Sequence, residues 1–359
     1  MVTIGIPILV SFGCALFVSV LILTTKSIHG RFSFDSNTTD IHKYHNLPTP
    51  RIGGIAFLFG LAVGGAYHGF QADQTLLLAK WAGIAALPVF LGGFFEDITN
   101  RVSPRDRLLL SFLSAAIAFY ELDVGLAVIG WPWFDENVLT IPGVSLVLTM
   151  VMLGGVAHAA NIIDGFNGLL LGFSVFALAT FCYVSFQIGE NILIIYMGIM
   201  IGAMLGVFCL NFPKGKLFLG DGGAYLIGFL LALFSLLLVK KHSDISPWFP
   251  LLVLIYPVNE TLFSMYRKKV VSGKSAMQPD DLHLHMLIYK NFGSSIGELT
   301  KLDRNPATAV IMWGVGVLPM IPAMIWWDQP RLLVLCVVIF IGGYIITYQK
   351  LAKSTIQNR

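Results

Sequence analysis

The sequence has 359 residues, of which 56% are hydrophobic and only 12% are charged, and its mean hydropathy is +0.78. Soluble globular domains carry roughly 25% charged residues, so this composition excludes an ordinary soluble domain and predicts a polytopic membrane protein. The formal net charge of +3 says little by itself, and we expect no nucleic-acid partner.

Apolar stretches long enough to cross a bilayer recur along the whole chain. A bilayer core of about 30 Å needs about 20 helical residues, and continuous rather than alternating apolar runs favour helices. We therefore predict an all-α fold, one integral membrane domain over residues 1–359, with about eleven transmembrane helices. The expected spans are 4–24, 53–70, 76–95, 108–120, 144–160, 169–186, 192–210, 225–239, 248–266, 307–327 and 332–348.

The basic residues divide very unevenly between the two sides of a membrane crossed in this way. All but four of the 23 Lys and Arg residues fall in loops on one side, and the exceptions are Lys80, Lys240, Lys241 and Arg331. The positive-inside rule makes the side rich in Lys and Arg cytoplasmic. The sequence therefore predicts an N-terminus outside the cell and a C-terminus in the cytoplasm.

The polar clusters with catalytic potential all lie on this predicted cytoplasmic side. They fall in the loops 25–52, 96–107, 158–168, 211–224 and 267–306, and we expect these five loops to form one active site. A membrane transporter or lipid flippase is the alternative, but such a protein would place ionisable residues near the middle of its spans. The spans predicted here hold almost none.

Carboxylates stand in two of these loops in settings that favour a cation. Glu96 and Asp97 are adjacent at the end of a span, and their mutual repulsion favours a cation beside them. A helix-end pair neutralised by Arg101 or Arg105 is the structural alternative. Asp221 stands between glycines just before a span. Because Mg²⁺ takes one or two carboxylates together with phosphate oxygens and water, Asp221 is a candidate metal ligand, although Gly-Asp-Gly-Gly is also a common turn.

A further polar stretch lies between two long apolar runs in the middle of the chain. Asn161 and Asp164 are three residues apart and so share one face of a helix, while Gly165 and Gly168 permit a ligand to approach the backbone closely. A helix-breaking turn with Asn and Asp as caps is the alternative. We favour a functional role for Asp164, and for His158 the role of a buried, hydrogen-bonded histidine.

Two histidines, His283 and His285, follow a basic cluster at residues 267–269. Protonated histidines at alternate positions can bind phosphate, whereas a zinc site would need a third His or Cys nearby. Taken together, carboxylates suited to Mg²⁺, glycines, basic groups and histidines gather at one membrane face. Phosphoryl transfer requires this set, because that reaction depends on positioning and charge neutralisation.

In their order along the chain, these motifs resemble those of the polyprenyl-phosphate N-acetylhexosamine-1-phosphate transferases (glycosyltransferase family 4), the membrane family that includes the bacterial enzyme making lipid I. The segments 49–54 (Thr-Pro-Arg-Ile-Gly-Gly), 161–168 and 218–222 carry the resemblance, which extends over residues 43–285. It implies a UDP-N-acetylhexosamine donor, an undecaprenyl-phosphate acceptor, Mg²⁺ with Mn²⁺ as a substitute, the bacterial inner membrane and a homodimer. The reaction would release UMP and initiate a cell-surface glycan.

The resemblance also implies roles for individual residues. The metal would be bound by Asp221 and Asp97, the catalytic residues would be Asp97, Glu96 and Asp164, and substrates would be bound by Asn161, Asn167, His283, His285, Arg51 and His45. The two later histidines are expected near the donor phosphates, and Asn161 and Asp164 in the nucleotide site.

Several positions depart from the pattern of the family. Glu96 replaces the first aspartate of a pair, Asn167 replaces the second aspartate of an Asp-Gly-x-Asp-Gly motif, and Met286 stands where many members have a further histidine. Asn46 and Asn100 occupy places where the lipid I enzymes carry lysine. We therefore place the chain outside the lipid I branch, nearer the enzymes that start O-antigen, capsule or similar glycans. A relative that has lost catalysis is a further alternative.

Overall fold

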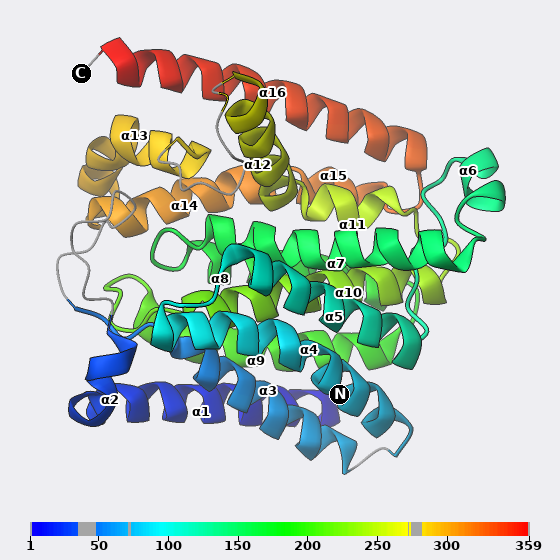
Figure 1. Cartoon of the computed structure of the whole chain (residues 1–359), viewed down its shortest axis with the longest axis horizontal. Helices are drawn as coiled ribbons and strands as arrows, with labels where there is room; N and C mark the ends of the chain where they lie inside the picture. Colours follow the sequence, from blue (N-terminus) through cyan, green and yellow to red (C-terminus); the bar gives the residue numbers. More distant parts are fainter. Residues whose placement is uncertain (1, 35–47, 71–72, 272, 274–281, 358–359) are drawn as a thin grey trace.

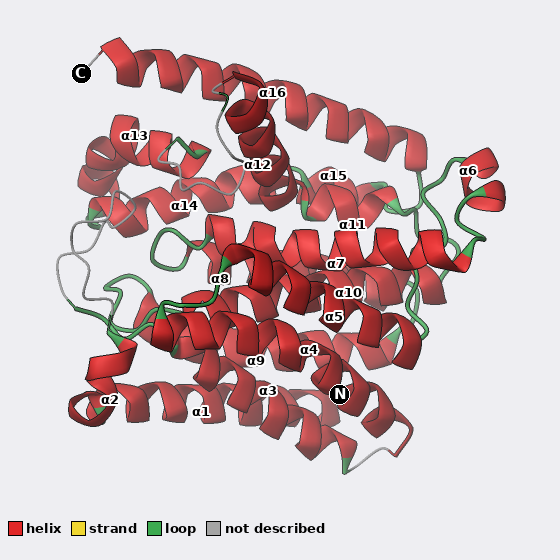
Figure 2. Ribbon diagram, viewed as in Figure 1, coloured by secondary structure: helices red, strands yellow, loops and turns green. Residues whose placement is uncertain are grey.

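A computed structural model describes residues 2–34, 48–70, 73–271, 273 and 282–357. Within these residues all regular structure is helical apart from one isolated bridge between Phe34 and Pro50 (Figure 2). The predicted all-α fold is therefore confirmed. His45 lies outside the described residues, as do parts of the expected loops 25–52 and 267–306.

The helices follow one another with mostly short connections. In chain order they are α1 (Val2–Thr24), α2 (Lys26–Ser33), α3 (Gly53–Gly69), α4 (Asp73–Thr99), α5 (Pro104–Glu121), α6 (Pro132–Asn137), α7 (Pro142–Ile163), α8 (Leu169–Gln187), α9 (Asn191–Asn211), α10 (Gly220–Lys241), α11 (Trp248–Val253), α12 (Ile255–Tyr266), α13 (Leu284–Thr300), α14 (Arg304–Val317), α15 (Met320–Ile325) and α16 (Pro330–Gln357). A π-helical turn, Arg267–Val271, follows α12 directly.

Eight helical segments of the described chain are long and apolar enough to cross a membrane. They are contributed by α1, α4, α7, α8, α9, α10, α14 with α15, and α16 (Figure 1). The apolar α3 is shorter, at 17 residues, and the expected span 248–266 is not one helix, because the chain breaks at Leu254 between α11 and α12. A polytopic membrane protein is confirmed, whereas the count of eleven spans and their orientation stay predictions.

The long helices lie side by side, and the two ends of the bundle differ. Figure 1 shows α2 and α13 at one end and α6 at the other. The N-terminus lies away from α2, whereas the C-terminus of α16 lies on the side of α13. The start of α1 and the end of α16 therefore lie toward opposite ends of the bundle.

The helix α10 forms the centre of the bundle. Every residue from Gly222 to Leu238 is buried, because a helix that is apolar on all sides is stable only when other elements surround it. It packs against α3, α4, α7, α8 and α9. Since α10 begins at Gly220, the acidic residue of its first turn, Asp221, is carried to the middle of one end of the bundle.

Glycines let three helices approach one another closely around Asp221. A Cβ atom added to Gly93 of α4 would lie 2.5 Å from the carbonyl carbon of Asp221 and from the nitrogen of Gly222. A Cβ atom on Gly54 of α3 would lie 2.5 Å from the nitrogen of Gly223. Small residues permit such backbone approach in membrane bundles, and here they bring α3 and α4 against the start of α10.

We predict that Gly93→Ala separates α4 from α10 and destabilises the protein by about 1–3 kcal/mol, the usual cost of overpacking. Gly83→Ala is the matched control, because it lies on the same helix with no atom within 4 Å of the added Cβ. That substitution should be neutral or stabilise by up to about 1 kcal/mol through helix propensity. Thermal unfolding of the two purified variants compares them, and equal melting temperatures would contradict the close packing.

Candidate active site

The carboxylate of Asp97 holds the first turn of α10. Its Oδ1 accepts a hydrogen bond from the backbone N–H of Asp221, and its Oδ2 accepts one from the N–H of Gly222, both at 2.9 Å. A helix start leaves these N–H groups without an intrahelical partner, and its dipole stabilises a negative charge. Asp97 is only 2% exposed, and it does not line the cavity described below.

Arg51 is the basic partner of Asp97. Its Nε and Nη2 atoms each lie 3.2 Å from Asp97 Oδ1, so Asp97 pairs with Arg51 and not with the Arg101 weighed in the sequence. The chain around Arg51 is fixed by backbone pairing, because Phe218 donates to the carbonyl of Pro50 at 2.8 Å. The Thr-Pro-Arg-Ile-Gly-Gly segment therefore lies directly against the segment that precedes α10.

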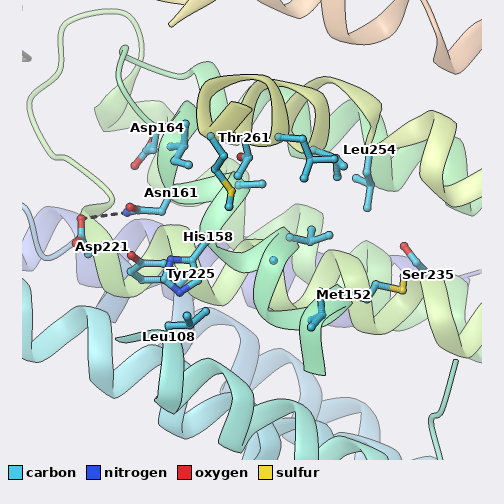
Figure 3. Close-up of a pocket in the computed structure, with 18 of the residues that line it drawn as sticks. Leu108, Met152, His158, Asn161, Asp164, Asp221, Tyr225, Ser235, Leu254 and Thr261 are labelled. Atoms are coloured by element: carbon cyan, nitrogen blue, oxygen red, sulfur yellow. Dashed lines mark hydrogen bonds between the residues drawn. The ribbon is translucent and has the colours of Figure 1, made fainter. Parts of the chain in front are cut away.

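Asp221 receives partners from three sides. Arg107 of α5 forms an ion pair with Oδ2 through Nη1, and Asn161 of α7 donates to Oδ1 at 3.1 Å (Figure 3). Arg51 Nη2 lies 3.8 Å from the same Oδ1. The guanidinium of Arg107 also lies over the ring of Tyr225, 5.8 Å from its centroid. Asp221, unlike Asp97, faces the cavity.

Asp164 caps α7 and also faces the cavity. The helix ends at Ile163, and Asp164 has φ −77° and ψ 43°, outside the helical region, as the turn alternative expected. Asp164 and Asn161 nevertheless line the same cavity (Figure 3). Desolvation by the surrounding protein, followed by the charges of Asp221 and Asp97, raises the pKa of Asp164 well above its ordinary value. The three carboxylates are therefore close enough to interact.

The turn between α7 and α8 is held by side-chain amides. The Asn167 side chain donates to the carbonyl of Pro213 at 2.9 Å, and its backbone N–H donates to Oδ1 of Asn305 at 2.8 Å. Gly168 has a φ of +77°, a conformation that other residues adopt only with strain. Its N–H donates to Asn211 Oδ1. These bonds fix the cavity wall that Asn167 forms.

The remaining candidates divide between the cavity and its surroundings. His283 lines the cavity, whereas His285 is fully buried with its ring edge against Phe166, at a centroid distance of 5.6 Å. Glu96 accepts from the backbone N–H of Val102 at 2.8 Å, which closes the turn after α4. His285 and Glu96 do not line the cavity, so their assigned roles stay predictions.

One cavity of about 1280 Å³ joins this polar cluster to an apolar groove. Its polar end is lined by Arg107, Asn161, Asp164, Asn167, Asp221 and His283. Its apolar part is lined by Phe112, Met152, Leu236, Leu251, Leu254 and Leu262, from α5, α7, α10, α11, α12 and the break before α12 (Figure 3). The lining extends along α10 from Asp221 to Val239, which at 1.5 Å per residue is about 27 Å. The whole cavity, polar end included, is thus nearly as long as a bilayer core is thick.

Comparison with known proteins assigns the chain to a family. Residues 81–239, which include most of α4 and of α10, match the model described as Glycosyl transferase family 4. The match covers 159 of the 359 residues and supports the family that the motifs of the chain resemble. The recognition made from its motifs is thereby confirmed.

Two relatives illustrate the range of family 4. A probable undecaprenyl-phosphate N-acetylglucosaminyl 1-phosphate transferase of Bacillus subtilis (strain 168) is 26% identical over 68% of this chain and 66% of its own length. A phospho-N-acetylmuramoyl-pentapeptide-transferase of Streptococcus pyogenes serotype M5 (strain Manfredo) is 28% identical over 75% of this chain and 82% of its own. Because both kinds of enzyme align, the branch outside lipid I synthesis stays a prediction.

The sequence analysis missed two residues of this family 4 site. Arg107 was not distinguished from its neighbours, although Ser103 and Pro104 are a helix-start signal and place Arg107 in the first turn of α5. His158 was expected to be a buried, hydrogen-bonded histidine, and it does form a hydrogen bond with the backbone of Arg107. Its Nε2, however, is buried without a hydrogen-bond partner among the described residues. The ring lines the cavity and meets the Tyr225 ring edge at 4.7 Å.

The residues present fit a magnesium ion whose remaining ligands come from the substrate and from water. Among the described residues no three His, Cys, Asp or Glu side chains are grouped closely enough to hold a metal by themselves. Mg²⁺, however, commonly uses one or two carboxylates and takes its other ligands from phosphates and water. The oxygens of both Asp221 and Asp97 have protein partners. Asp221 faces the cavity, where a phosphate could approach it, whereas Asp97 does not line the cavity.

We predict that Asp164→Asn stabilises the metal-free protein, and more so at higher pH. The folded state raises the pKa of Asp164, so this group lowers the free energy of unfolding once it would ionise in the unfolded chain. The loss is absent below the unfolded-state pKa and grows as the pH rises toward the folded-state pKa. The melting temperature in EDTA should rise by a few degrees at pH 8 and by less at pH 5. An equal or reversed difference at the two pH values would rule out this electrostatic cost.

Proposed function

We propose that this protein transfers an N-acetylhexosamine-1-phosphate from a UDP-sugar to undecaprenyl phosphate, releases UMP and so initiates a cell-surface glycan outside the lipid I pathway. One observation carries the proposal. A single cavity joins a cluster of acidic, basic and amide groups to a long apolar groove. A water-soluble nucleotide sugar requires polar groups and a lipid phosphate requires apolar walls, and such a cavity offers the two at its two ends.

The polar end suits the donor. A diphosphate needs positive charge, which Arg51 and Arg107 carry at the rim of the carboxylate cluster. A base and a sugar need hydrogen-bonding groups in fixed positions, which the side chains of Asn161 and Asn167 supply on the cavity wall. Both relatives are named as transferases of a phosphorylated sugar, which supports a nucleotide-sugar donor.

The apolar groove suits the acceptor. The cavity is about 27 Å long along α10, estimated from the helical rise, and its apolar part could hold a polyprenyl chain along the thickness of the bilayer. Arg107 and Leu108 are neighbours on the groove wall, so a phosphate at the head of the chain would meet the guanidinium while its isoprene units contact Leu108 and Phe112. The Bacillus relative is named for undecaprenyl phosphate.

The chemistry is a phosphoryl transfer. An oxygen of the lipid phosphate bonds to the β-phosphorus of the donor, the bond from that phosphorus to the bridging oxygen breaks, and UMP leaves with that oxygen. The residues of this chain orient the two substrates, exclude water through the groove walls and neutralise the phosphate charges. Mg²⁺ bound at Asp221, with Mn²⁺ as a substitute, would neutralise the charge that develops on the phosphate oxygens.

The proposed active site faces the cytoplasm of a bacterial cell, because UDP-sugars are cytoplasmic and most basic residues belong to this side by the positive-inside rule. The homodimer that the resemblance implies stays a prediction.

The decisive experiment supplies the purified protein with undecaprenyl phosphate, Mg²⁺ and either UDP-N-acetylglucosamine or UDP-N-acetylgalactosamine. We expect one donor to give UMP and a lipid product whose mass equals undecaprenyl pyrophosphate plus the sugar. Asp221→Asn should lower UMP release by about a hundredfold or more, at the upper end for a lost metal-site group. Asp123→Asn, at an exposed acid that pairs with Lys240, should leave the rate unchanged. UMP release that did not need the lipid, or full activity in Asp221→Asn, would contradict the proposal.

The groove yields a separate prediction for the acceptor. Gly155 of α7 lines the cavity with open space around its Cβ position, so Gly155→Leu should fill part of the groove. We expect the KM for undecaprenyl phosphate to rise about tenfold, with the KM for the UDP-sugar within twofold of the original. Gly143→Leu is the matched control, because Gly143 begins the same helix with equally open space but does not line the cavity. If both variants raised the lipid KM equally, the groove would not be the acceptor site.

A further inference from the structure

A buried carboxylate outside the cavity has no role in the reaction described so far. Glu260 of α12 is 1% exposed, and a charge at such depth is costly unless it is fully hydrogen-bonded. Its Oε1 accepts from His283 Nδ1 at 2.9 Å and from the backbone N–H of Leu284 at 3.1 Å. Its Oε2 accepts from the hydroxyl of Tyr344 at 2.8 Å. The three donors come from the start of α13 and from α16.

The position of Glu260 on α12 separates it from the groove. Val258, Thr261, Leu262 and Met265 line the cavity, and their spacing of three and four residues places them on one face of the helix. Glu260 is buried but does not line the cavity, so it lies on the opposite side of α12. It therefore acts on the cavity only through the groups it binds.

His283 is the group through which Glu260 reaches the cavity. His283 is among the residues that line the cavity. The bond to Glu260 engages Nδ1, so Nε2 is the ring nitrogen left for a ligand. A donor phosphate that accepts from Nε2–H, while Nδ1–H donates to Glu260, requires a ring with a proton on both nitrogens. The carboxylate of Glu260 supplies the negative charge that balances such a ring.

We propose that Glu260 is a positioning residue that fixes the His283 ring, so that Nε2 donates a hydrogen bond to the diphosphate of the nucleotide donor. The proposal rests on the proposed function for the identity of the donor, but it concerns phosphate binding alone. A carboxylate that orients an imidazole through its other nitrogen sets both the tautomer and the direction of the ring.

Binding of UDP and of uridine to the full-length purified protein separates this role from a structural one. Isothermal titration with Mg²⁺ present would measure both affinities, since only UDP carries the diphosphate. We expect Glu260→Gln and His283→Asn each to weaken UDP about tenfold, the range for a hydrogen bond to a charged group. Uridine affinity should stay within twofold. The affinity of the double variant for UDP should be no lower than that of the single variant with the lower affinity, because both substitutions remove the same interaction.

A second Glu–His pair in this chain supplies the matched control. Glu190 accepts from His242 Nε2 at 2.9 Å, and it precedes α9 at the end of the bundle opposite to Asp221. Glu190→Gln therefore makes the same chemical change in the same kind of pair, and it should leave both affinities unchanged. If Glu260→Gln does not fold, Glu260→Asp tests the same idea, since it keeps the charge but withdraws the carboxylate by one methylene.

The outcomes separate the two proposals of function. Equal weakening of UDP and uridine by Glu260→Gln would show a structural role, and unchanged UDP affinity would show that Glu260 does not position His283. Either result overturns the inference. If, in contrast, the original protein binds UDP with the expected pattern but releases no UMP from any UDP-sugar, the proposed reaction fails while the positioning role stands.

Discussion

The contact between Asp97 and the first backbone N–H groups of α10 is the interaction on which the rest of the site depends. It joins the end of α4 to the start of the central helix, and it does so where the helix dipole favours a negative charge. Asp221 is the first of the two residues whose N–H groups are held, so the same contact fixes the backbone that carries the cavity's acidic side chain. Glycine at position 93 makes the approach of the two helices sterically possible.

This arrangement changes how the paired acids of the sequence are to be understood. Adjacent carboxylates at a span end predict a cation beside them, and a cation is present, but it is the guanidinium of Arg51. Glu96 and Asp97 have different roles. Glu96 accepts a hydrogen bond from the turn that follows α4, and Asp97 accepts one from α10. Adjacency in sequence therefore indicates where charge is needed, and only the packing of α4 against α10 shows which residue faces the ligand.

The sequence was sufficient for the features that depend on local composition. Apolar runs predicted helices, and Asp164 and Asp221 were picked out because each is a carboxylate next to glycine beside an apolar span. Residues whose role depends on helix rotation were harder. Arg107 differs from Arg101 and Arg105 only in facing inward once α5 begins at Pro104, and Glu260 was concealed within an expected span that is in fact two helices. An acid inside an apolar run was itself a signal, but its partners come from segments distant in sequence.

Because the chain breaks at Leu254, α12 is a separate helix that contributes to the cavity in two ways. One face of α12 lines the apolar groove, and the other holds His283 through Glu260. Because side-chain directions on a helix are fixed relative to one another, the two faces cannot rotate independently. A lipid that packs against Leu262 and a phosphate that contacts His283 would therefore share one rigid element. The bond from Tyr344 anchors that element to α16, so the geometry of the polar end is set by helices that lie behind the cavity as well as by those that line it.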